Sequence, residues 1–304
     1  MEHYSQFSRE AWKTFGVAYD IHLTEDTLKK LTSLNDRVSL DDVTDIYMPM
    51  VRLFDLYLKH HIEKQSSLQD FLHQPKRKVP FIIGISGSVS VGKSTTARLL
   101  QTMLQQLYPN KQIELMTTDG FLLTTATLKE RGILDKKGFP ESYDMERLVS
   151  FLMAVKTSDE PVLAPVYSHE IYDIIPDTYQ TVQQSDVLIV EGINVLQLPP
   201  NRDIYVSDFF DWAIYVDAEP VNIEKWYLQR FEMLMDLAKN NPSNYYYKYA
   251  IGKREDAIAM AKEVWKNTNL KNLVEFILPT KTRADLVLHK TENHLIDYVL
   301  LKNY

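Results

Sequence analysis

The residues from Gly87 to Thr95 have the composition and spacing of a phosphate-binding loop. The stretch GSVSVGKST places Gly87, Gly92, Lys93 and Ser94 in the order G-x-x-x-x-G-K-S. Glycine adopts backbone conformations that other residues disfavour, so such a loop can turn its amide groups inward around phosphate oxygens. The lysine then neutralises phosphate charge, and the serine hydroxyl ligates Mg²⁺. We expect a nucleoside triphosphate to bind Gly87, Ser88, Val89, Ser90, Val91, Gly92, Lys93, Ser94 and Thr95.

Asp119, in the stretch TTDGF, is the best candidate for a general base. A kinase that phosphorylates an alcohol needs a group that accepts the proton of the attacking hydroxyl. Asp119 ends the predicted strand that follows the helix of the phosphate loop, and ligands of parallel sheets gather at the carboxyl ends of the strands. An aspartate that only caps the next turn is the alternative interpretation.

Polar and aromatic residues in two further stretches are candidates for ligand contacts. APVYSHEIYD, residues 164–173, carries Tyr167 and His169 between prolines, and KWYLQRF places Tyr227 and Arg230 on one face of a predicted helix. Arg230 could stabilise the charge of a moving phosphoryl group. The alternatives are an exposed or structural histidine, and a surface arginine above an aromatic stripe. Glu191 ends the strand-like run VLIVEG.

The composition excludes several classes of protein. The net charge of −7 gives nucleic acid little electrostatic support, and the chain has no cysteine for disulfides or thiolate metal sites. The N-terminus lacks the pattern of a signal peptide, and no stretch approaches the ~20 apolar residues of a membrane span. We expect a cytoplasmic protein that binds neither nucleic acid nor membranes. A GTPase is disfavoured because no N-K-x-D motif follows a late strand.

The pattern of apolar residues predicts an α/β fold, a mainly parallel sheet flanked by helices. Strands are expected at 79–85, 112–119, 186–192, 212–218 and 284–290, and helices at 92–107, 222–239 and 254–268. Residues 1–78 are predicted to be an N-terminal helical extension, in which Ser39 caps a helix. We expect residues 1–304 to form a single domain.

Several motifs together resemble the bacterial type I pantothenate kinases, which are related to the phosphoribulokinase and uridine kinase family. They are GSVSVGKSTTARLL, TTDGFL, LKERG, KKGFPESYDMERL, APVYSHEIYD, VLIVEGINVLQ, YVSDFFD, WYLQRF and ILPT, and they occur in that family's order. The phosphate loop alone is generic. KKGFPESYDM together with PVYSHEIYD is far more specific, and separates the chain from uridine kinases and phosphoribulokinases.

The resemblance implies a P-loop kinase fold and an enzyme that uses ATP and Mg²⁺. It would phosphorylate the primary hydroxyl of pantothenate to 4′-phosphopantothenate, the first committed step of coenzyme A synthesis. Members of the family are homodimers, and coenzyme A typically inhibits them in competition with ATP. The same resemblance therefore implies pantothenate and ATP as substrates, coenzyme A as an inhibitor, and a second copy of the chain as a partner.

The resemblance also gives roles to individual residues. Lys93 and Ser94 belong to the site of the phosphates and Mg²⁺, and Glu191 faces the metal. Asp119 is the base, and Arg230 lies near the transferred phosphoryl group. Pantothenate-pocket positions match Tyr167, His169, Tyr227 and Asn269, and positions that contact coenzyme A match Arg98, Lys93 and His169.

Two departures from the family pattern concern inhibition rather than catalysis. Leu234 stands where the family has an aromatic residue at the thiol end of the coenzyme A site, and NTNLKNL lacks the tryptophan expected after Asn269. The strength of inhibition and the acceptance of extended pantothenate analogues therefore stay open. Two other functions also stay open: a kinase of another small alcohol, such as uridine, and a nucleotide-binding regulator without catalysis.

Overall fold

The computed structural model describes residues 3–198 and 203–304. The strands are β1 (Tyr4–Ser8), β2 (Phe81–Gly87), β3 (Ile113–Thr117), β4 (Val162–Ser168), β5 (Asp173–Val182), β6 (Val187–Glu191), β7 (Trp212–Ala218), β8 (Leu286–Lys290) and β9 (Ile296–Lys302). The helices are α1 (Arg9–Lys13), α2 (Glu25–Leu31), α3 (Leu40–Asp42), α4 (Met48–Phe71), α5 (Lys93–Leu107), α6 (Thr125–Glu130), α7 (Met145–Thr157), α8 (Pro220–Ala238), α9 (Tyr247–Ala250), α10 (Arg254–Val264) and α11 (Leu270–Asn272).

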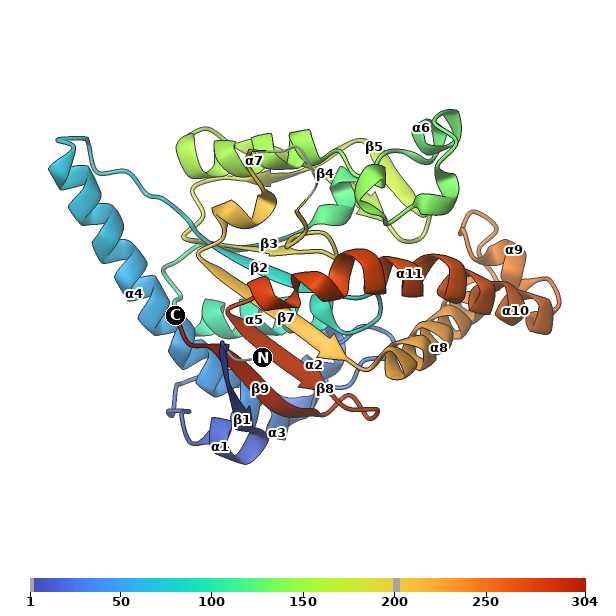
Figure 1. Cartoon of the computed structure of the whole chain (residues 1–304), viewed down its shortest axis with the longest axis horizontal. Coiled ribbons are helices and arrows are strands. Elements are labelled where there is room, and N and C mark those ends of the chain that lie inside the picture. The colour runs from blue at the N-terminus through green and yellow to red at the C-terminus, as the bar shows by residue number, and fades with distance from the viewer. Residues whose placement is uncertain (1–2, 199–202) are drawn as a thin grey trace.

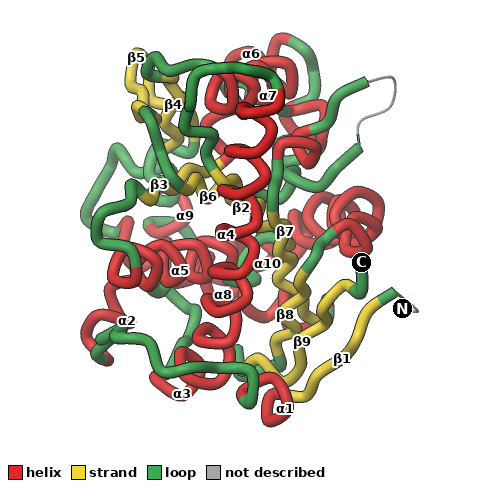
Figure 2. Tube along the Cα trace, turned by 90° about the vertical axis from the view of Figure 1, so that its left-hand side faces the viewer, coloured by secondary structure: helices red, strands yellow, loops and turns green. Residues whose placement is uncertain are grey.

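Seven strands form a central sheet in the order β1-β9-β8-β7-β2-β6-β3. The five strands from β8 to β3 are parallel, and β9 and β1 add antiparallel pairings at one edge. Every residue of β2 and β7 is buried, as expected for central strands covered on both faces. Figure 2 shows the strands following one another from β3 to β1. The five strands expected from the sequence are therefore confirmed, as is the mainly parallel sheet.

Helices cover the sheet and frame the carboxyl ends of its strands. Helix α5 packs on β2, β3 and β6, and β7 points toward the start of α8 (Figure 1). Helices α8, α9 and α10 lie beyond that edge of the sheet, and the hairpin β4–β5 lies with α6 and α7 along another side (Figure 1). The phosphate loop, which connects β2 to α5, therefore lies between these two groups of elements.

The N-terminal region is helical over most of its length, but its first residues are not. Helices α2 and α4 lie in it, and Ser39 begins α3 with a capping box that Asp42 completes, as predicted. Tyr4–Ser8 instead forms β1, which pairs with β9. The two ends of the described chain lie near each other in Figures 1 and 2. The amide of Asn303 donates to the carbonyl oxygen of His3 at 3.0 Å. The helical assignment of residues 1–78 is wrong for this segment, because its pairing partner is almost 300 residues away in sequence.

The stretch APVYSHEIYD, which carries Tyr167 and His169, forms a β-hairpin. Tyr167 lies near the end of β4, His169 lies in the turn, and β5 begins at Asp173. Pro165 is tolerated because β4 and β5 form a two-stranded ribbon, in which half of the amide groups need no partner. The pairing also shifts register between Pro165 and Tyr167.

Candidate active site

The phosphate loop has the backbone conformation that its glycines were expected to supply. Gly87 has φ +144° and passes so close to β7 that a Cβ atom there would lie 2.4 Å from the carbonyl oxygen of Val216. Gly92 has φ +104° and begins α5, and no side chain caps this helix. The amide groups of its first turn are therefore left for an anion.

Two side chains of the loop bind neighbouring protein groups. Lys93 is buried, and its Nζ donates to the carbonyl oxygen of Ser88 at 2.7 Å, across the loop. Ser94 Oγ donates to Glu191 Oε1 at 2.8 Å. Glu191 reaches this position because it ends β6, level with Ile85 of β2 and Thr117 of β3. The parallel register thus brings the predicted metal residues together.

A cavity of about 260 Å³ opens beside the loop. The predicted residues that line it come from six different segments, and they are Val89, Ser90, Lys93, Ser94, Asp119, Tyr167, His169, Glu191, Tyr227, Arg230 and Asn269. His169 is exposed at its position in the hairpin turn, whereas Arg230 is partly buried against the cavity rather than on the open surface. The cavity therefore brings together eleven of the seventeen predicted site residues, and those that do not line it are Gly87, Ser88, Val91, Gly92, Thr95 and Arg98.

Burial and the nearby cations act in opposite directions on the pKa of Asp119. Burial raises the pKa of the Asp119 carboxyl, while the nearby cations Lys93, Arg230 and Lys137 act to lower it. Burial likewise raises the pKa of Glu191 and lowers the pKa of Lys93. Carboxylates and cations confined together in a partly dehydrated cavity are typical of a catalytic site, because their mutual attraction replaces lost hydration.

The sequence is closely similar to curated pantothenate kinases over its whole length. It is 56% identical to the pantothenate kinase of Latilactobacillus sakei and 56% identical to that of Ligilactobacillus salivarius, in each case over 99% of this chain and 98% of the relative. The chain belongs to the pantothenate kinase family. The model of the phosphoribulokinase / uridine kinase family also matches, over residues 82–230. The fold resembles that of D-glycerate 3-kinase from Cryptococcus neoformans, with TM-score 0.51 and 15% identity, over 81% of this chain and 97% of that one.

Two of the predicted residues turn away from the cavity of this pantothenate kinase family member. Thr95 Oγ1 accepts from the amide of Ser33 at 3.1 Å, and Arg98 donates to the carbonyl oxygen of Leu31 at 2.7 Å. Neither residue lines the cavity. A phosphate contact of Thr95 would therefore use its backbone amide, and the coenzyme A contact of Arg98 stays a prediction.

Sequence reasoning missed several residues of the kinase cavity. They are Lys137, Tyr143, Tyr245, Tyr246, Tyr249 and Asn272. Lys137 lies 4.3 Å from the centre of the Tyr172 ring, which stacks on Tyr245 at 4.4 Å. Lys137 and Tyr143 belong to the motif KKGFPESYD, so their signal was present in the sequence. The tyrosines of NNPSNYYYKYA gave only a biased composition.

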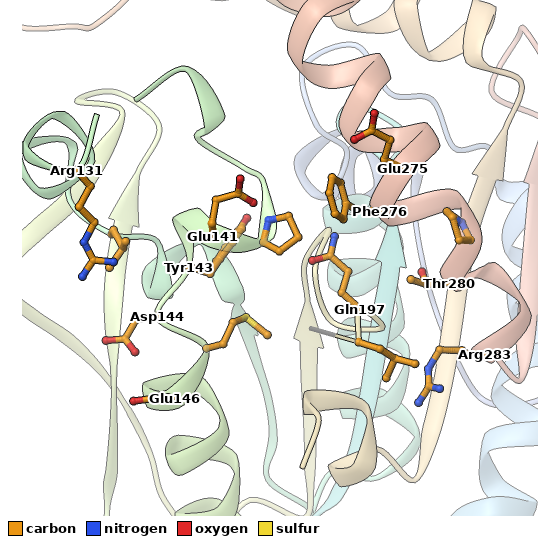
Figure 3. Close-up of a pocket in the computed structure, with 15 residues that line it drawn as sticks. Arg131, Glu141, Tyr143, Asp144, Glu146, Gln197, Glu275, Phe276, Thr280 and Arg283 are labelled. Carbon is orange, nitrogen blue, oxygen red and sulfur yellow. The ribbon is translucent and has the colours of Figure 1, made fainter. Parts of the chain in front are cut away.

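A larger cavity of about 960 Å³ lies on another side of the FPESYD segment. Figure 3 shows Arg131, Glu141 and Asp144 on one side of it and Phe276 and Arg283 on the other, with Gln197 between them. It contains no part of the phosphate loop and none of the predicted catalytic residues. The smaller cavity is therefore the candidate active site. It is lined by the phosphate loop and by the predicted catalytic residues, which the larger cavity lacks.

The raised pKa of Asp119 has a consequence for the pH dependence of the kinase. The base accepts a proton only when it is ionised, so kcat/KM for the alcohol substrate should fall as the pH falls through the pKa of Asp119. We expect the midpoint of this acid limb above the ordinary aspartate value of 3.8, because burial disfavours the carboxylate. Initial rates measured from pH 3 upward test this; a limb at or below 3.8 would contradict it.

Among the helices of residues 3–198 and 203–304, none combines the length and the apolar character that crossing a bilayer requires.

Proposed function

We propose that this kinase transfers the γ-phosphoryl group of ATP to the primary hydroxyl of pantothenate, giving 4′-phosphopantothenate for coenzyme A synthesis. The relatives that match nearly the whole chain carry the name pantothenate kinase. One observation supports the chemistry most directly: the phosphate loop and Asp119 line the same cavity, so a triphosphate and an alcohol can meet there.

In this mechanism each charged residue has one task. Asp119 orients the pantothenate hydroxyl and accepts its proton as the oxygen bonds to the γ-phosphorus. The bond between that phosphorus and the bridging oxygen breaks, and ADP leaves with the electron pair. Lys93 and Arg230 balance the negative charge of the moving group, where positioning and electrostatics supply most of the rate.

Ser94 and Glu191 fit a magnesium ion that accompanies ATP. Mg²⁺ takes oxygen ligands and usually combines one or two protein groups with water and substrate phosphates. Their direct hydrogen bond of 2.8 Å places a hydroxyl and a carboxylate side by side at the end of the phosphate loop. When bound, the ion would neutralise phosphate charge during transfer.

The other side of the cavity suits the polar and methyl groups of pantothenate. Tyr167, Tyr227 and Asn269 supply hydroxyl and amide groups, and the rings of Tyr172 and Tyr245 supply apolar surface. Burial raises the pKa of the Tyr227 hydroxyl to about 12, so it stays a hydrogen-bond donor at neutral pH. These groups match a substrate with hydroxyls, an amide, a carboxylate and a gem-dimethyl group.

An acceptor panel tests the proposed reaction. The purified chain with Mg–ATP should release ADP when pantothenate is added, and should give no more than background with uridine, glycerate or ribulose 5-phosphate. The product should carry one phosphate on the primary hydroxyl. Turnover of uridine but not pantothenate would favour a kinase of another alcohol, and nucleotide binding without any product would favour a regulator.

Inhibition by coenzyme A and the homodimer are further proposals that rest on the family. Of the residues assigned to the inhibitor, Lys93 and His169 line the cavity. Leu234 lines it too, at the position where an aromatic residue was expected. Repeating the pantothenate assay with added coenzyme A at several ATP concentrations tests competition, and sedimentation of the purified chain tests the dimer.

A further inference from the structure

A segment from the N-terminal region crosses the first turns of helix α5. We call residues 31–36, which begin at the last residue of α2, the strap. Arg98 of α5 donates through Nε to the carbonyl oxygen of Leu31 at 2.7 Å and through Nη2 to Ser33 Oγ at 3.0 Å. The amide of Ser33 donates in turn to Thr95 Oγ1 at 3.1 Å. The strap is therefore fixed to the helix that begins at the phosphate loop.

The strap ends in a buried ion pair. Asp36 Oδ1 lies 2.6 Å from Lys290 Nζ, and the two side chains are only 3% and 4% exposed. Lys290 is the last residue of β8, so the pair joins the N-terminal region to the C-terminal part of the sheet. His294 Nδ1 also lies within 3.0 Å of Asp36 Oδ1.

The carboxylate of Asp36 and the ammonium group of Lys290 both lie beside Gly92 of the phosphate loop. A Cβ atom on Gly92 would lie 2.5 Å from Asp36 Oδ2 and 2.7 Å from Lys290 Nζ, so any other residue at this position would have to displace the buried pair. Asp36 Oδ2 is buried and has no hydrogen-bond partner among the described residues. The ion pair therefore lies beside the residue from which the chain enters Lys93 and the first turn of α5.

The pairing also matters for the electric field at the phosphate site. A lone carboxylate behind an anion-binding loop would repel the phosphates, and this effect is strong in a buried place where water screens little. The ammonium group of Lys290 cancels most of that charge at short range. Asp36 can thus touch the loop without weakening its attraction for an anion.

We propose that Asp36 is a positioning residue of the kinase, which sets the phosphate loop through its contact with Gly92 while Lys290 neutralises its charge. The inference rests on the proposed use of ATP. It makes the strap part of the phosphate-binding apparatus, although both residues of the pair lie outside the span 82–230 that the family model matches.

Three variants and one control test the proposal: Asp36→Asn, Lys290→Met, the double variant, and Asp42→Asn. Asp42 is also a buried carboxylate of the N-terminal region, 2.6 Å from Arg9, but it belongs to the capping box of α3. Calorimetry with Mg–ADP measures phosphate-loop affinity without any acceptor. Steady-state assays then separate KM for ATP from KM for pantothenate.

We expect Asp36→Asn to raise the Kd for Mg–ADP and the KM for ATP by about tenfold, with KM for pantothenate changed less than about twofold. The amide loses the ion pair that holds the side chain beside Gly92, and we expect this loss of positioning to outweigh the attraction of the freed Lys290 ammonium group for phosphate. Lys290→Met should be worse, because it leaves an unpaired carboxylate behind the loop, and the double variant should recover part of the loss. Asp42→Asn should lower Tm yet leave Kd within about twofold of the wild type.

Other outcomes would overturn the positioning role. They are an unchanged Kd in Asp36→Asn, an equal change in Asp42→Asn, or a double variant that binds Mg–ADP more weakly than Lys290→Met.

If the variants do not fold, hydrogen exchange on the wild type decides. Magnesium tripolyphosphate, which lacks a nucleobase and a ribose, should protect amides in residues 31–36 but not in 40–47. Lack of protection in the strap would reject the idea. Mg–ADP affinity stays measurable even if pantothenate proves not to be the acceptor, so the two failures are distinguishable.

Discussion

Replacing Asp119 by asparagine is expected to lower kcat for pantothenate by about 10³-fold, because the amide cannot accept the proton of the attacking hydroxyl. Mg–ADP should still bind, since Asp119 lies outside the loop that holds the phosphates. The variant should also be more stable at neutral pH. The folded protein raises the pKa of this carboxyl, so the ionised form destabilises the fold above that pKa, and a neutral isostere removes the penalty.

ADP release with pantothenate, calorimetry with Mg–ADP and thermal denaturation measure the three effects. Asp144→Asn is the matched control: Asp144 caps α7 by accepting from the amide of Arg147 at 3.1 Å, and asparagine caps equally well. We expect that control to keep kcat within about twofold and Tm nearly unchanged. Near-normal turnover in Asp119→Asn would remove the base assignment.

Replacing Lys93 by methionine is expected to lower kcat/KM for ATP by about 10²- to 10³-fold, the loss typical of one preorganised electrostatic contact to a transition state. Lys93 Nζ bonds to the carbonyl oxygen of Ser88 at 2.7 Å, so the ammonium group is already held across the loop before any phosphate arrives. The methionine side chain keeps the length and the burial but lacks both the charge and the donor.

The matched control for this change is Lys225→Met on helix α8. Lys225 pairs with Glu292 at 2.6 Å, but both side chains are about half exposed or more, and surface pairs of this kind contribute little. Steady-state kinetics on both variants should leave Lys225→Met close to the wild type. Equal activity of Lys93→Met and Lys225→Met would exclude a role of the ammonium group in transfer.

Features that depend on neighbouring residues could be predicted from the sequence. The phosphate loop is one of them, because its glycines, lysine and serine lie within residues 87–94 and between a strand and a helix. The capping box of Ser39 and Asp42 is another, since both bonds join residues three apart. Asp119 followed from one further rule, that ligands of parallel sheets gather at the carboxyl ends of the strands, whereas the metal role of Glu191 was implied by the family resemblance.

Features that join distant segments were decided by the tertiary structure alone. Strand β1 takes its partner from β9, the rings of Tyr172 and Tyr245 meet across more than seventy residues, and Asp36 meets Lys290 across 254 residues. No local pattern marks such pairs, because each residue taken singly suits an exposed loop equally well. Their positions follow from how the whole sheet closes around its core, which spacing along the chain does not reveal.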